Sequence, residues 1–499
     1  MMGVVNVITR NGSGINGTEF SSSYQTTEGM VQERLSMGKK LDNGIDALIS
    51  FSGLQARGAD RFFDFGSSGI SGTANGLNGE DVKQGFARLS YKSLSFDFLY
   101  GNRHKEDPTS SLLSDPLTRT VLNNPHLQTQ LQYNESFANN TLNVLARVFL
   151  GQYDFSQSFF LGGEKFRVTG PSSWHGAELR LLSTAITNHQ LMMGVEYQNS
   201  TSIKQTFQNS ATDENLIVTN SAVVRIGVYA QDGWRITDTL SATVGLRYDY
   251  NNWIGNRLSP RGALVWQATP KTTFKVLYGR AHRSPNSYER DFSSVAVTGA
   301  VNSGLNGETV DTTELVADYQ PITNMIVRAS AYYWNMHGII TEQFDLATNN
   351  FVYQPTPHRI IAKGTELSVD KTWDWGARTR ASFGIQDADQ HHSHLPNSPY
   401  HLGKLNLSVP IPLMKNLRAG YELQYYGKRK TVDGPNTDSY FLSNLNLVTD
   451  VRWVKGLEAS LSIYNLFDEN YQHPTTASNW QNIFLQPDGT LRFRMDYRF

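Results

Sequence analysis

The sequence contains no cysteine and almost no imbalance of charge. Its 499 residues hold 44 Lys and Arg against 45 Asp and Glu, which gives a formal net charge of -1. No run of basic residues is interleaved with aromatic ones, so no nucleic-acid partner is predicted. The absence of cysteine fits an envelope protein that avoids stray disulfides, but it fits many soluble proteins equally well.

Long hydrophobic runs are missing too. No segment approaches the roughly 18 consecutive apolar residues that a membrane-spanning helix needs, and this excludes a helical membrane protein. A membrane β-barrel is not excluded, because its lipid-facing residues occupy only every second position of each strand. No Pro-rich or charge-rich linker divides the chain, so one large β architecture accounts most simply for its length.

Signals for export and for catalysis are also absent. The first ten residues, MMGVVNVITR, have no basic region and no small-residue cleavage site. They do not read as a signal peptide, so we expect any export signal to lie outside this sequence. There is no G-x-S-x-G, no H-E-x-x-H and no phosphate loop, so no enzymatic activity and no cofactor are predicted. A hydrolase remains a formal alternative.

One glycine pattern imitates a nucleotide-binding motif. Gly12, Gly14 and Gly17 form G-x-G-x-x-G directly after the apparent strand VVNVIT. A dinucleotide site needs a helix to follow, so that the helix N-terminus meets the pyrophosphate. The residues that follow, TEFSSSYQTTEG, are polar and β-like. We therefore interpret residues 11–17 as a flexible connection.

Short turns recur along the whole chain. Asn43-Gly44 is the strongest of them, because a two-residue hairpin turn of the primed type wants a positive φ at both positions. Ten tight turns alternate with longer polar loops, and this predicts about 22 antiparallel strands. The turns are LDNGID (41–46), YKSLS (91–95), SFANNTL (136–142), AITNHQ (185–190), ITDTLS (236–241), QATPKTT (267–273), QPITNM (320–325), DWGAR (374–378), PLMKNL (412–417) and WVKGLE (453–458).

The predicted strands carry two different faces. The last nine residues, LRFRMDYRF, place Leu, Phe, Met, Tyr and Phe on one side and three arginines with one aspartate on the other. Short turns on one rim, long loops on the opposite rim and alternating faces are typical of an all-β, 22-stranded antiparallel transmembrane β-barrel with periplasmic turns and extracellular loops. Aromatic residues at segment ends would form interfacial girdles. They are Trp234, Trp253, Trp266, Trp373 and Trp453.

Both ends of the chain resemble one family. GVVNVITR (3–10) resembles the closing strand of the plug domain of TonB-dependent outer-membrane receptors, and YNLFDENY (464–471) resembles their C-terminal box. RAHRSPNSYER (280–290), LNGETVDTTELVADY (305–319) and KGTELSVD (363–370) follow in family order. The resemblance implies that residues 1–10 are the last strand of a truncated plug, 11–17 a Gly-rich connection and 18–499 the transmembrane barrel.

For the complete receptor the resemblance implies TonB-energised import of a scarce, bulky nutrient across the cell outer membrane, with an iron-siderophore or another metal chelate as the default and cobalamin or haem as alternatives. The TonB complex would be a partner only if the missing plug and N-terminal box exist. Outer-membrane lipid and the barrel-assembly machinery are further expected partners, the latter engaging Tyr497 and Phe499. A plugless passive pore and a structural or adhesive surface barrel remain open.

Two sets of residues are candidate sites. QDADQHHSHLP carries imidazoles and carboxylates that are able to ligate a transition metal or a metal-bearing ligand, although a solvated polar loop is the simpler interpretation. Lumen-facing arginines could guide an anionic ligand, contact the plug or simply hydrate the wall. Replacing Arg247 by Leu is expected to change stability little. The loop candidates are Asp387, Asp389, His391, His392, His394, His282 and Arg283, and the lumen-facing set is Arg247, Arg492, Arg494 and Arg498.

Overall fold

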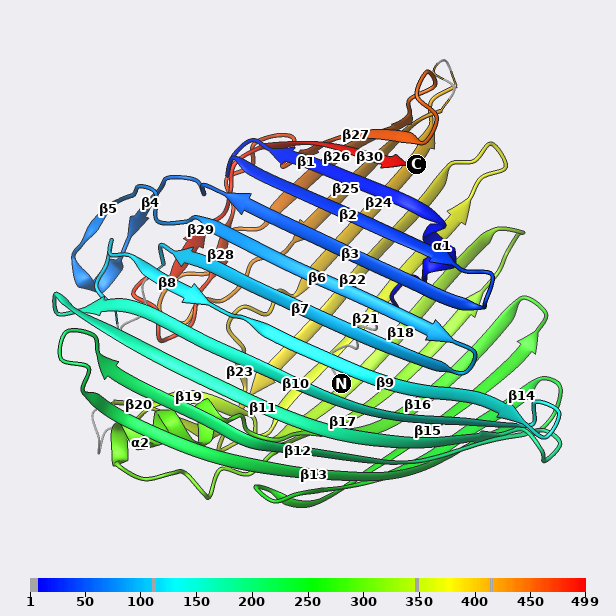
Figure 1. Cartoon of the computed structure of the whole chain (residues 1–499), viewed down its shortest axis with the longest axis horizontal. Helices are drawn as coiled ribbons and strands as arrows, with labels where there is room; N and C mark the ends of the chain where they lie inside the picture. Colours follow the sequence, from blue (N-terminus) through cyan, green and yellow to red (C-terminus); the bar gives the residue numbers. More distant parts are fainter. Residues whose placement is uncertain (1–7, 110–113, 346–349, 413, 415) are drawn as a thin grey trace.

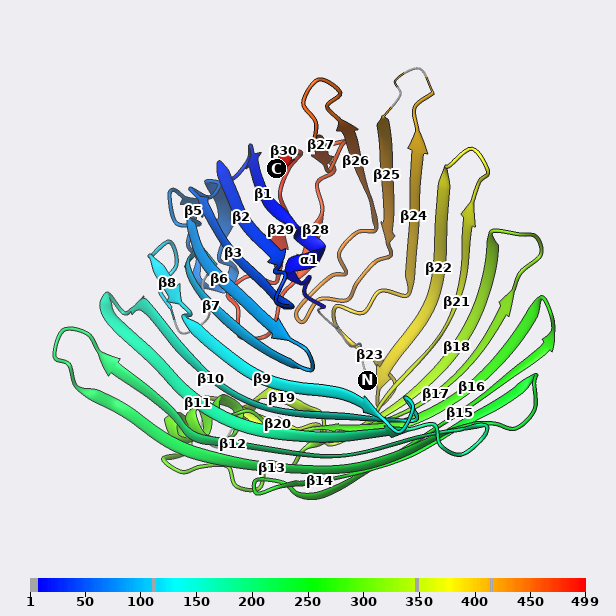
Figure 2. The same cartoon turned by 45° about the vertical axis from the view of Figure 1, so that its right-hand side comes forward.

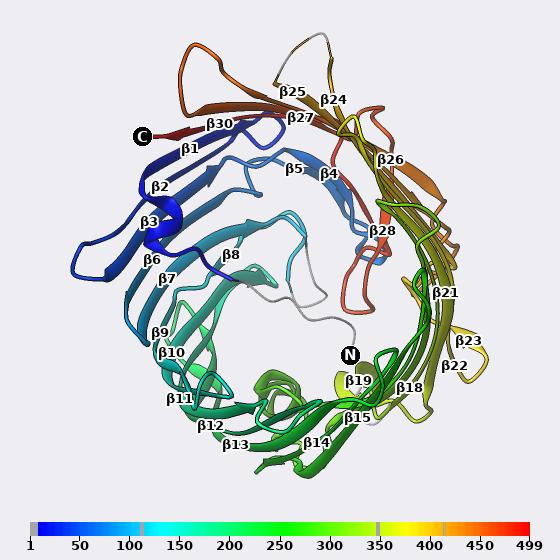
Figure 3. The ribbon, with the colours of Figure 1, turned by 90° about the vertical axis from the view of Figure 1, so that its right-hand side faces the viewer.

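A computed structural model describes residues 8–109, 114–345, 350–412, 414 and 416–499. Strands dominate it and enclose a wide lumen (Figures 1 and 3). One sheet holds 24 strands, of which β8 (Thr120–Asn123) and β23 (Ser393–His394) are short additions. The other 22 form a closed antiparallel barrel, as the sequence predicts.

The first half of the barrel contains its longest strands. It consists of β1 (Gly17–Gln25), β2 (Met30–Lys40), β3 (Ile45–Ala56), β6 (Glu80–Tyr91), β7 (Leu94–Asp107), β9 (His126–Phe137), β10 (Leu142–Leu161), β11 (Glu164–Ser183), β12 (His189–Asn209), β13 (Asn215–Arg235) and β14 (Leu240–Asn251).

The second half returns to the starting strand. It consists of β15 (Gly255–Thr269), β16 (Thr272–Arg283), β17 (Glu308–Tyr319), β18 (Met325–His337), β21 (Ile360–Thr372), β22 (Arg378–Gln390), β24 (His401–Pro410), β25 (Leu417–Tyr426), β26 (Tyr440–Asp450), β27 (Leu457–Tyr464) and β30 (Thr490–Arg498). β30 pairs with β1 in register from Glu19↔Arg498 to Gln25↔Arg492, which closes the barrel and leaves no free sheet edge.

The two rims of the barrel differ, as Figures 1 and 2 show. All ten predicted tight turns fall between consecutive barrel strands at one end, which we call the short-turn rim; in the turn at 412–417, residues 413 and 415 lie outside the described residues. The opposite end, the loop rim, has some short turns, such as the one between Leu161 and Glu164, but it also has the long connections, which carry the remaining elements. These are β4 (Arg61–Asp64), η1 (Gly66–Ser68), β5 (Ser71–Ala74), η2 (Tyr288–Phe292), α2 (Ser293–Thr298), β19 (Ile340–Asp345), β20 (Asn350–Pro355), β28 (Gln472–Pro474) and β29 (Ile483–Leu485).

The outer face of the wall is apolar and exposed. Leu246 on β14 and Phe493 on β30 are each 49% exposed, although both are large apolar residues in regular strands. An exposed apolar band of this kind is what a lipid-facing wall presents. The most deeply buried apolar side chains lie at the loop rim instead, where Phe65 and Leu305 are at most 1% exposed. The hydrophobic packing therefore stabilises the loops, while backbone hydrogen bonds close the wall.

Tryptophans mark the short-turn rim. Trp234, Trp266, Trp373 and Trp453 are exposed at or beside the strand ends there, which agrees with an interfacial girdle. Trp253 differs, since it lies at the loop rim, where its indole N–H donates to the Ala222 carbonyl at 3.0 Å.

A short helical turn precedes the first strand. α1 (Gly12–Ile15) is capped by the Asn11 side chain and packs on β2 and β3, and the Gly12 amide donates to the Asp46 carboxylate at 2.5 Å. The segment expected to be a flexible connection is therefore tied to the barrel wall. Of the predicted plug strand, residues 1–7 lie outside the described residues and 8–10 form no strand. Among the described residues, no helix has the length and apolar character needed to cross a membrane.

Candidate functional site

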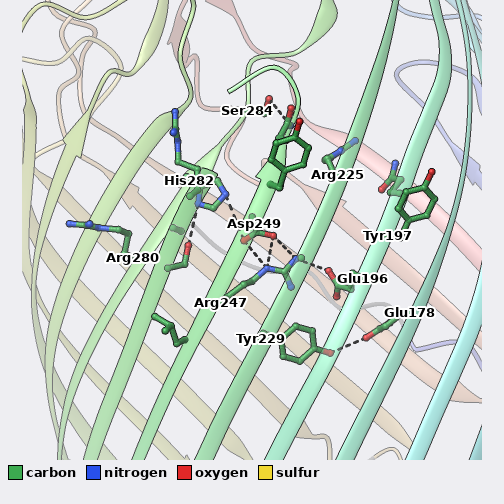
Figure 4. Close-up of a pocket in the computed structure, with 18 of the residues that line it drawn as sticks. Glu178, Glu196, Tyr197, Arg225, Tyr229, Arg247, Asp249, Arg280, His282 and Ser284 are labelled. Atoms are coloured by element: carbon green, nitrogen blue, oxygen red, sulfur yellow. Dashed lines mark hydrogen bonds and ion pairs between the residues drawn. The ribbon is translucent and has the colours of Figure 1, made fainter. Parts of the chain in front are cut away.

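A recess of about 1180 Å³ is hollowed into the inner face of the wall between β10 and β16 (Figure 4). Its lining contains seven arginines but only Glu178, Glu196 and Asp249 as carboxylates. The chain as a whole has a net charge of -1, so positive charge is concentrated here. Ligand sites of small molecules usually measure about 300–1,000 Å³, and this recess is large enough for a bulky ligand.

Glycines at inward positions create the depth of the recess. The side chain of Tyr229 lies over Gly194, where an added Cβ would meet its hydroxyl at 2.4 Å. Arg247 lies over Gly227 in the same way, with 2.2 Å between an added Cβ and its Nη2. Long side chains of one strand therefore lie across the backbone of the preceding strand instead of filling the lumen.

An ion-pair network fixes the floor of the recess. Arg247 crosses Gly227 and places its guanidinium between two carboxylates, 2.7 Å from Glu196 and 2.8 Å from Asp249. The Tyr229 hydroxyl donates to Glu178 at 3.2 Å. Figure 4 shows these groups converging from neighbouring strands. Removing Arg247 would leave Glu196 and Asp249 without their shared partner. We therefore now expect Arg247→Leu to lower stability, rather than to change it little.

Four other arginines of the recess are not neutralised. Within the described part of the chain, no carboxylate forms an ion pair with Arg180, Arg225, Arg257 or Arg261. Among the described residues, these four side chains make one hydrogen bond, in which Arg257 Nη1 donates to the Asn256 carbonyl at 2.9 Å. Charged donors without protein acceptors are suited to an external anion.

His282 belongs to this recess, whereas Arg283 does not. The His282 ring lies 3.2 Å from the Ser259 hydroxyl and 3.8 Å from Asp249. Arg283 forms ion pairs with Glu308 at 2.6 Å and with Glu289 at 3.0 Å, so it stabilises the connection between β16 and β17. Of the predicted site residues, Arg247 and His282 therefore come together.

The predicted histidine loop is a tight hairpin on a different part of the rim. His391 and His392 form its turn with φ of 50° and 65°, between β22 and β23. His394 is satisfied internally, with Nδ1 3.1 Å from Asp387 and Nε2 2.6 Å from the Ser398 carbonyl. The ring of His358, from the preceding loop, lies 4.4 Å from that of His391.

This hairpin projects from the outer side of the barrel (Figure 3). Asp387 and Asp389 continue the face of β22 that carries Phe383 and Ile385, two exposed apolar residues of the outer surface. Asp387 and Asp389 therefore point away from the lumen. Among the described residues, no group of three or more His, Asp or Glu side chains converges in a way that could hold a metal ion.

The arginines of the last strand lie at the closure of the barrel, away from the recess. Arg494 pairs with Asp496 at 2.7 Å, and Arg492 donates to Gln32 at 3.0 Å. Arg498 approaches Glu19 to 3.0 Å, and Arg10 binds the same carboxylate at 2.5 Å. These residues hold the seam between β30 and β1.

A second recess, of about 700 Å³, lies at the loop rim between the β1–β2 turn, the β3–β4 connection and residues 485–488. In the neighbouring C-terminal loop, burial and then the charge of Arg429 lower the pKa of His473 below its usual value. The His473 ring lies 3.3 Å from the hydroxyl of Tyr440. The lining of this second recess mixes both signs of charge, since it includes Arg57 and Arg61 together with Asp60 and Asp488.

Residues 40–466 match the family model described as "TonB dependent receptor-like, beta-barrel". The chain belongs to this family of receptor barrels. Membership confirms the resemblance seen in the sequence and agrees with the prediction that the protein is not an enzyme. The family match says nothing about the recess, which comes from the structure alone.

Similar proteins share the barrel at low identity. The vitamin B12 transporter BtuB of Vibrio cholerae is 24% identical over 290 residues, which are 56% of this chain and 43% of BtuB. This chain therefore spans less than half the length of the curated relatives it matches. Among solved structures, the copper transporter OprC (TM-score 0.75, 15% identity) covers 97% of this chain, and 80% of OprC is covered. The FrpB iron transporter of Neisseria meningitidis (TM-score 0.74, 14% identity) gives 98% and 83%.

Proposed function

We propose that the chain is the barrel of an outer-membrane receptor that imports a scarce, bulky ligand with energy supplied through the TonB complex. The observation that carries this proposal is the arginine-lined recess on the lumen wall of a closed 22-stranded barrel of this family. A wall that only adheres to a surface has no need of unneutralised cations facing its interior.

The orientation follows from the two rims. Outer-membrane barrels place short turns in the periplasm and long loops outside. The short-turn rim would therefore face the periplasm and the loop rim the medium, and the exposed band around Leu246 would meet lipid. A ligand that enters from outside passes the loop rim before it reaches the recess.

A metal chelate is the proposed ligand class. The similar structures include a transporter named for copper, another for iron and a third for ferric citrate, and the curated relatives are named for vitamin B12. Two of these names, ferric citrate and vitamin B12, denote a metal held by an organic molecule, and the other two name a metal alone. The recess supports an iron-siderophore or related chelate, whereas the outward-facing histidine hairpin adds nothing inside the lumen.

Further partners follow from the same function. Energised transport requires a plug and a TonB-binding segment, which would have to precede the barrel. Tyr497 and Phe499, whose rings lie 4.3 Å apart at the end of β30, form the proposed signal for the barrel-assembly machinery. His391 and His392 could still contact a ligand on its approach, since both are exposed at the loop rim.

The experiment is uptake by the host under metal limitation. Cells lacking the gene should lose energy-dependent accumulation of at least one radiolabelled ferric chelate, and restoring the gene should recover it. Collapsing the proton gradient or removing the TonB complex should abolish the recovered uptake. Uptake that persists in the deletion strain, or large single-channel conductance of the native protein with uncoupled uptake, would instead favour a passive pore.

A further inference from the structure

We infer that the recess selects a ligand that presents several carboxylate or phosphate oxygens, and that Arg180, Arg225, Arg257 and Arg261 bind it. This inference rests on the proposed function, because it names the chemical class that the barrel would admit. The residues come from three strands, β11, β13 and β15, and line one continuous recess that faces the lumen.

The charged groups of the recess divide into paired and unpaired ones. The three carboxylates of the recess are already engaged: Arg147 lies 2.6 Å from Glu178, and Arg247 bridges the other two. Arg280 finds its partner on the neighbouring strand, where Asp311 lies 2.8 Å away. The remaining four arginines therefore add positive charge that the described residues do not compensate.

Strand register places these cations around the acidic floor. Arg225 is in register with Asn251, and Arg257 with Asp249, so the two arginines are two strands and one inward position apart. With strands about 4.8 Å apart and inward positions about 6.8 Å apart, their Cα atoms are separated by about 12 Å. That spacing lets both guanidinium groups reach one ligand of the size that the recess holds.

The other two arginines extend the same surface toward the short-turn rim. Arg261 is in register with Gly245, two inward positions below Arg257 on the same strand, and its side chain lies over that glycine. Arg180 is in register with Gly194 on the far side of Tyr229. The arginines thus approach the recess from two sides and from above and below, which suits a ligand carrying several anionic groups.

Guanidinium chemistry favours oxygen anions over other ligands. Each arginine offers a planar fork of donors that matches a carboxylate or phosphate in bidentate fashion, and it stays charged at every physiological pH. A neutral ligand would leave these donors without acceptors, and a cationic one would be repelled. The lumen wall of β11 to β15 therefore discriminates by charge before any finer contact is made.

The test measures anion binding by the purified chain in detergent micelles. Titration calorimetry gives the affinity for citrate, pyrophosphate and spermidine. Citrate probes carboxylates, pyrophosphate probes phosphates, and spermidine is the cationic comparison. The double variant R225Q/R257Q should bind the preferred anion at least 10-fold more weakly than the parent. R235Q is the matched control, because Arg235 lies on the same strand as Arg225, at the short-turn rim and outside the recess, with no ion pair among the described residues.

The expected result is anion binding that weakens with added salt, falls at least 10-fold in R225Q/R257Q and stays within twofold of the parent in R235Q. Spermidine should show no binding. Equal affinity in the parent and the double variant, no anion binding by the parent, or a preference for spermidine would each overturn the inference. Circular dichroism and heat-modified gel mobility show whether each variant is folded. The uptake experiment is independent of this one. If energised import occurs but neither citrate nor pyrophosphate binds, the proposed function stands and only the inference of an anionic ligand is rejected.

Discussion

Replacing Leu246 by arginine tests whether the outer face of the wall meets lipid. Leu246 lies six residues from Leu240, which is in register with Trp266 near the short-turn rim. At about 3.4 Å per residue and a strand tilt of about 45°, the rise is about 14 Å above this tryptophan. The apolar band of such barrels is about 25 Å tall, so Leu246 lies close to its midplane.

The expected cost follows from that depth. An arginine on the lipid face at the midplane destabilises a barrel by roughly 2–4 kcal/mol, and the penalty falls toward zero near the interfaces. Leu246 has no polar partner to offer the new side chain, because its register neighbours are Ala230 and Pro260. We expect Leu246→Arg to reach the middle of that range.

The assay is reversible guanidinium unfolding of the barrel in lipid vesicles, followed by tryptophan fluorescence. Gln231→Arg is the matched control, since Gln231 is in register with Gly245, the neighbour of Leu246, but faces the lumen. The control should change the free energy of unfolding by less than about 0.5 kcal/mol, as exposed surface substitutions do. Leu246→Ala separates the lost apolar contact from the added charge.

Two results would refute the reasoning. If Leu246→Arg cost no more than Gln231→Arg, the face that carries Leu246 would be wet rather than lipid-facing. If both substitutions cost several kcal/mol, the lumen side would be dry and packed at this level, and the recess would not be open to a ligand.

Three further outcomes are expected. Gly227→Ala should displace Arg247 and lower the free energy of unfolding by about 1 kcal/mol at most, because the ion pairs of Arg247 are partly hydrated. Gly262→Ala is the control and should be nearly neutral, since an added Cβ there meets only one carbonyl oxygen, at 3.9 Å. Unfolding in lipid vesicles measures both. The pKa of His473 is lowered in the folded loop, so near and below the unfolded value of about 6.5 the unfolded loop binds more protons than the folded loop. Loop stability should therefore fall from pH 7 toward pH 5, as measured by hydrogen exchange. His473→Gln should remove this pH dependence. Deleting Phe499 should reduce the amount of barrel in the outer membrane, measured by fractionation, without changing refolding in vitro.

Periodicity and turn chemistry made most of the barrel predictable. Local residues such as Asn43-Gly44 predict each tight turn, and the side-chain period of two assigns the faces within a strand. The terminal strand illustrates this, since Phe493 is exposed on the outside while Arg494 bonds to Asp496 on the inside. Both signals are local, so a single sequence contains them.

The recess was not predictable, because it depends on register between strands. Nothing in the sequence states that Arg225 is level with Asn251 or that Arg257 is level with Asp249, since loop lengths and bulges set these alignments. Of its arginines only Arg247 stood out as a candidate. The histidine hairpin lies at the loop rim, as expected, and its outward direction is also readable from the sequence, because the period of two that puts Ile385 outside also puts Asp387 outside.

In the proposed orientation, the long strands β10 to β13 determine what the barrel presents to the medium. These strands contain 20 or 21 residues, whereas about 9–11 suffice to cross a bilayer, so about half of each stands beyond the apolar band. This projecting part is a hydrogen-bonded sheet and not a set of loose loops. A protease in the medium would find little cleavable backbone there, and antibodies raised against it would recognise folded epitopes that short peptides do not reproduce.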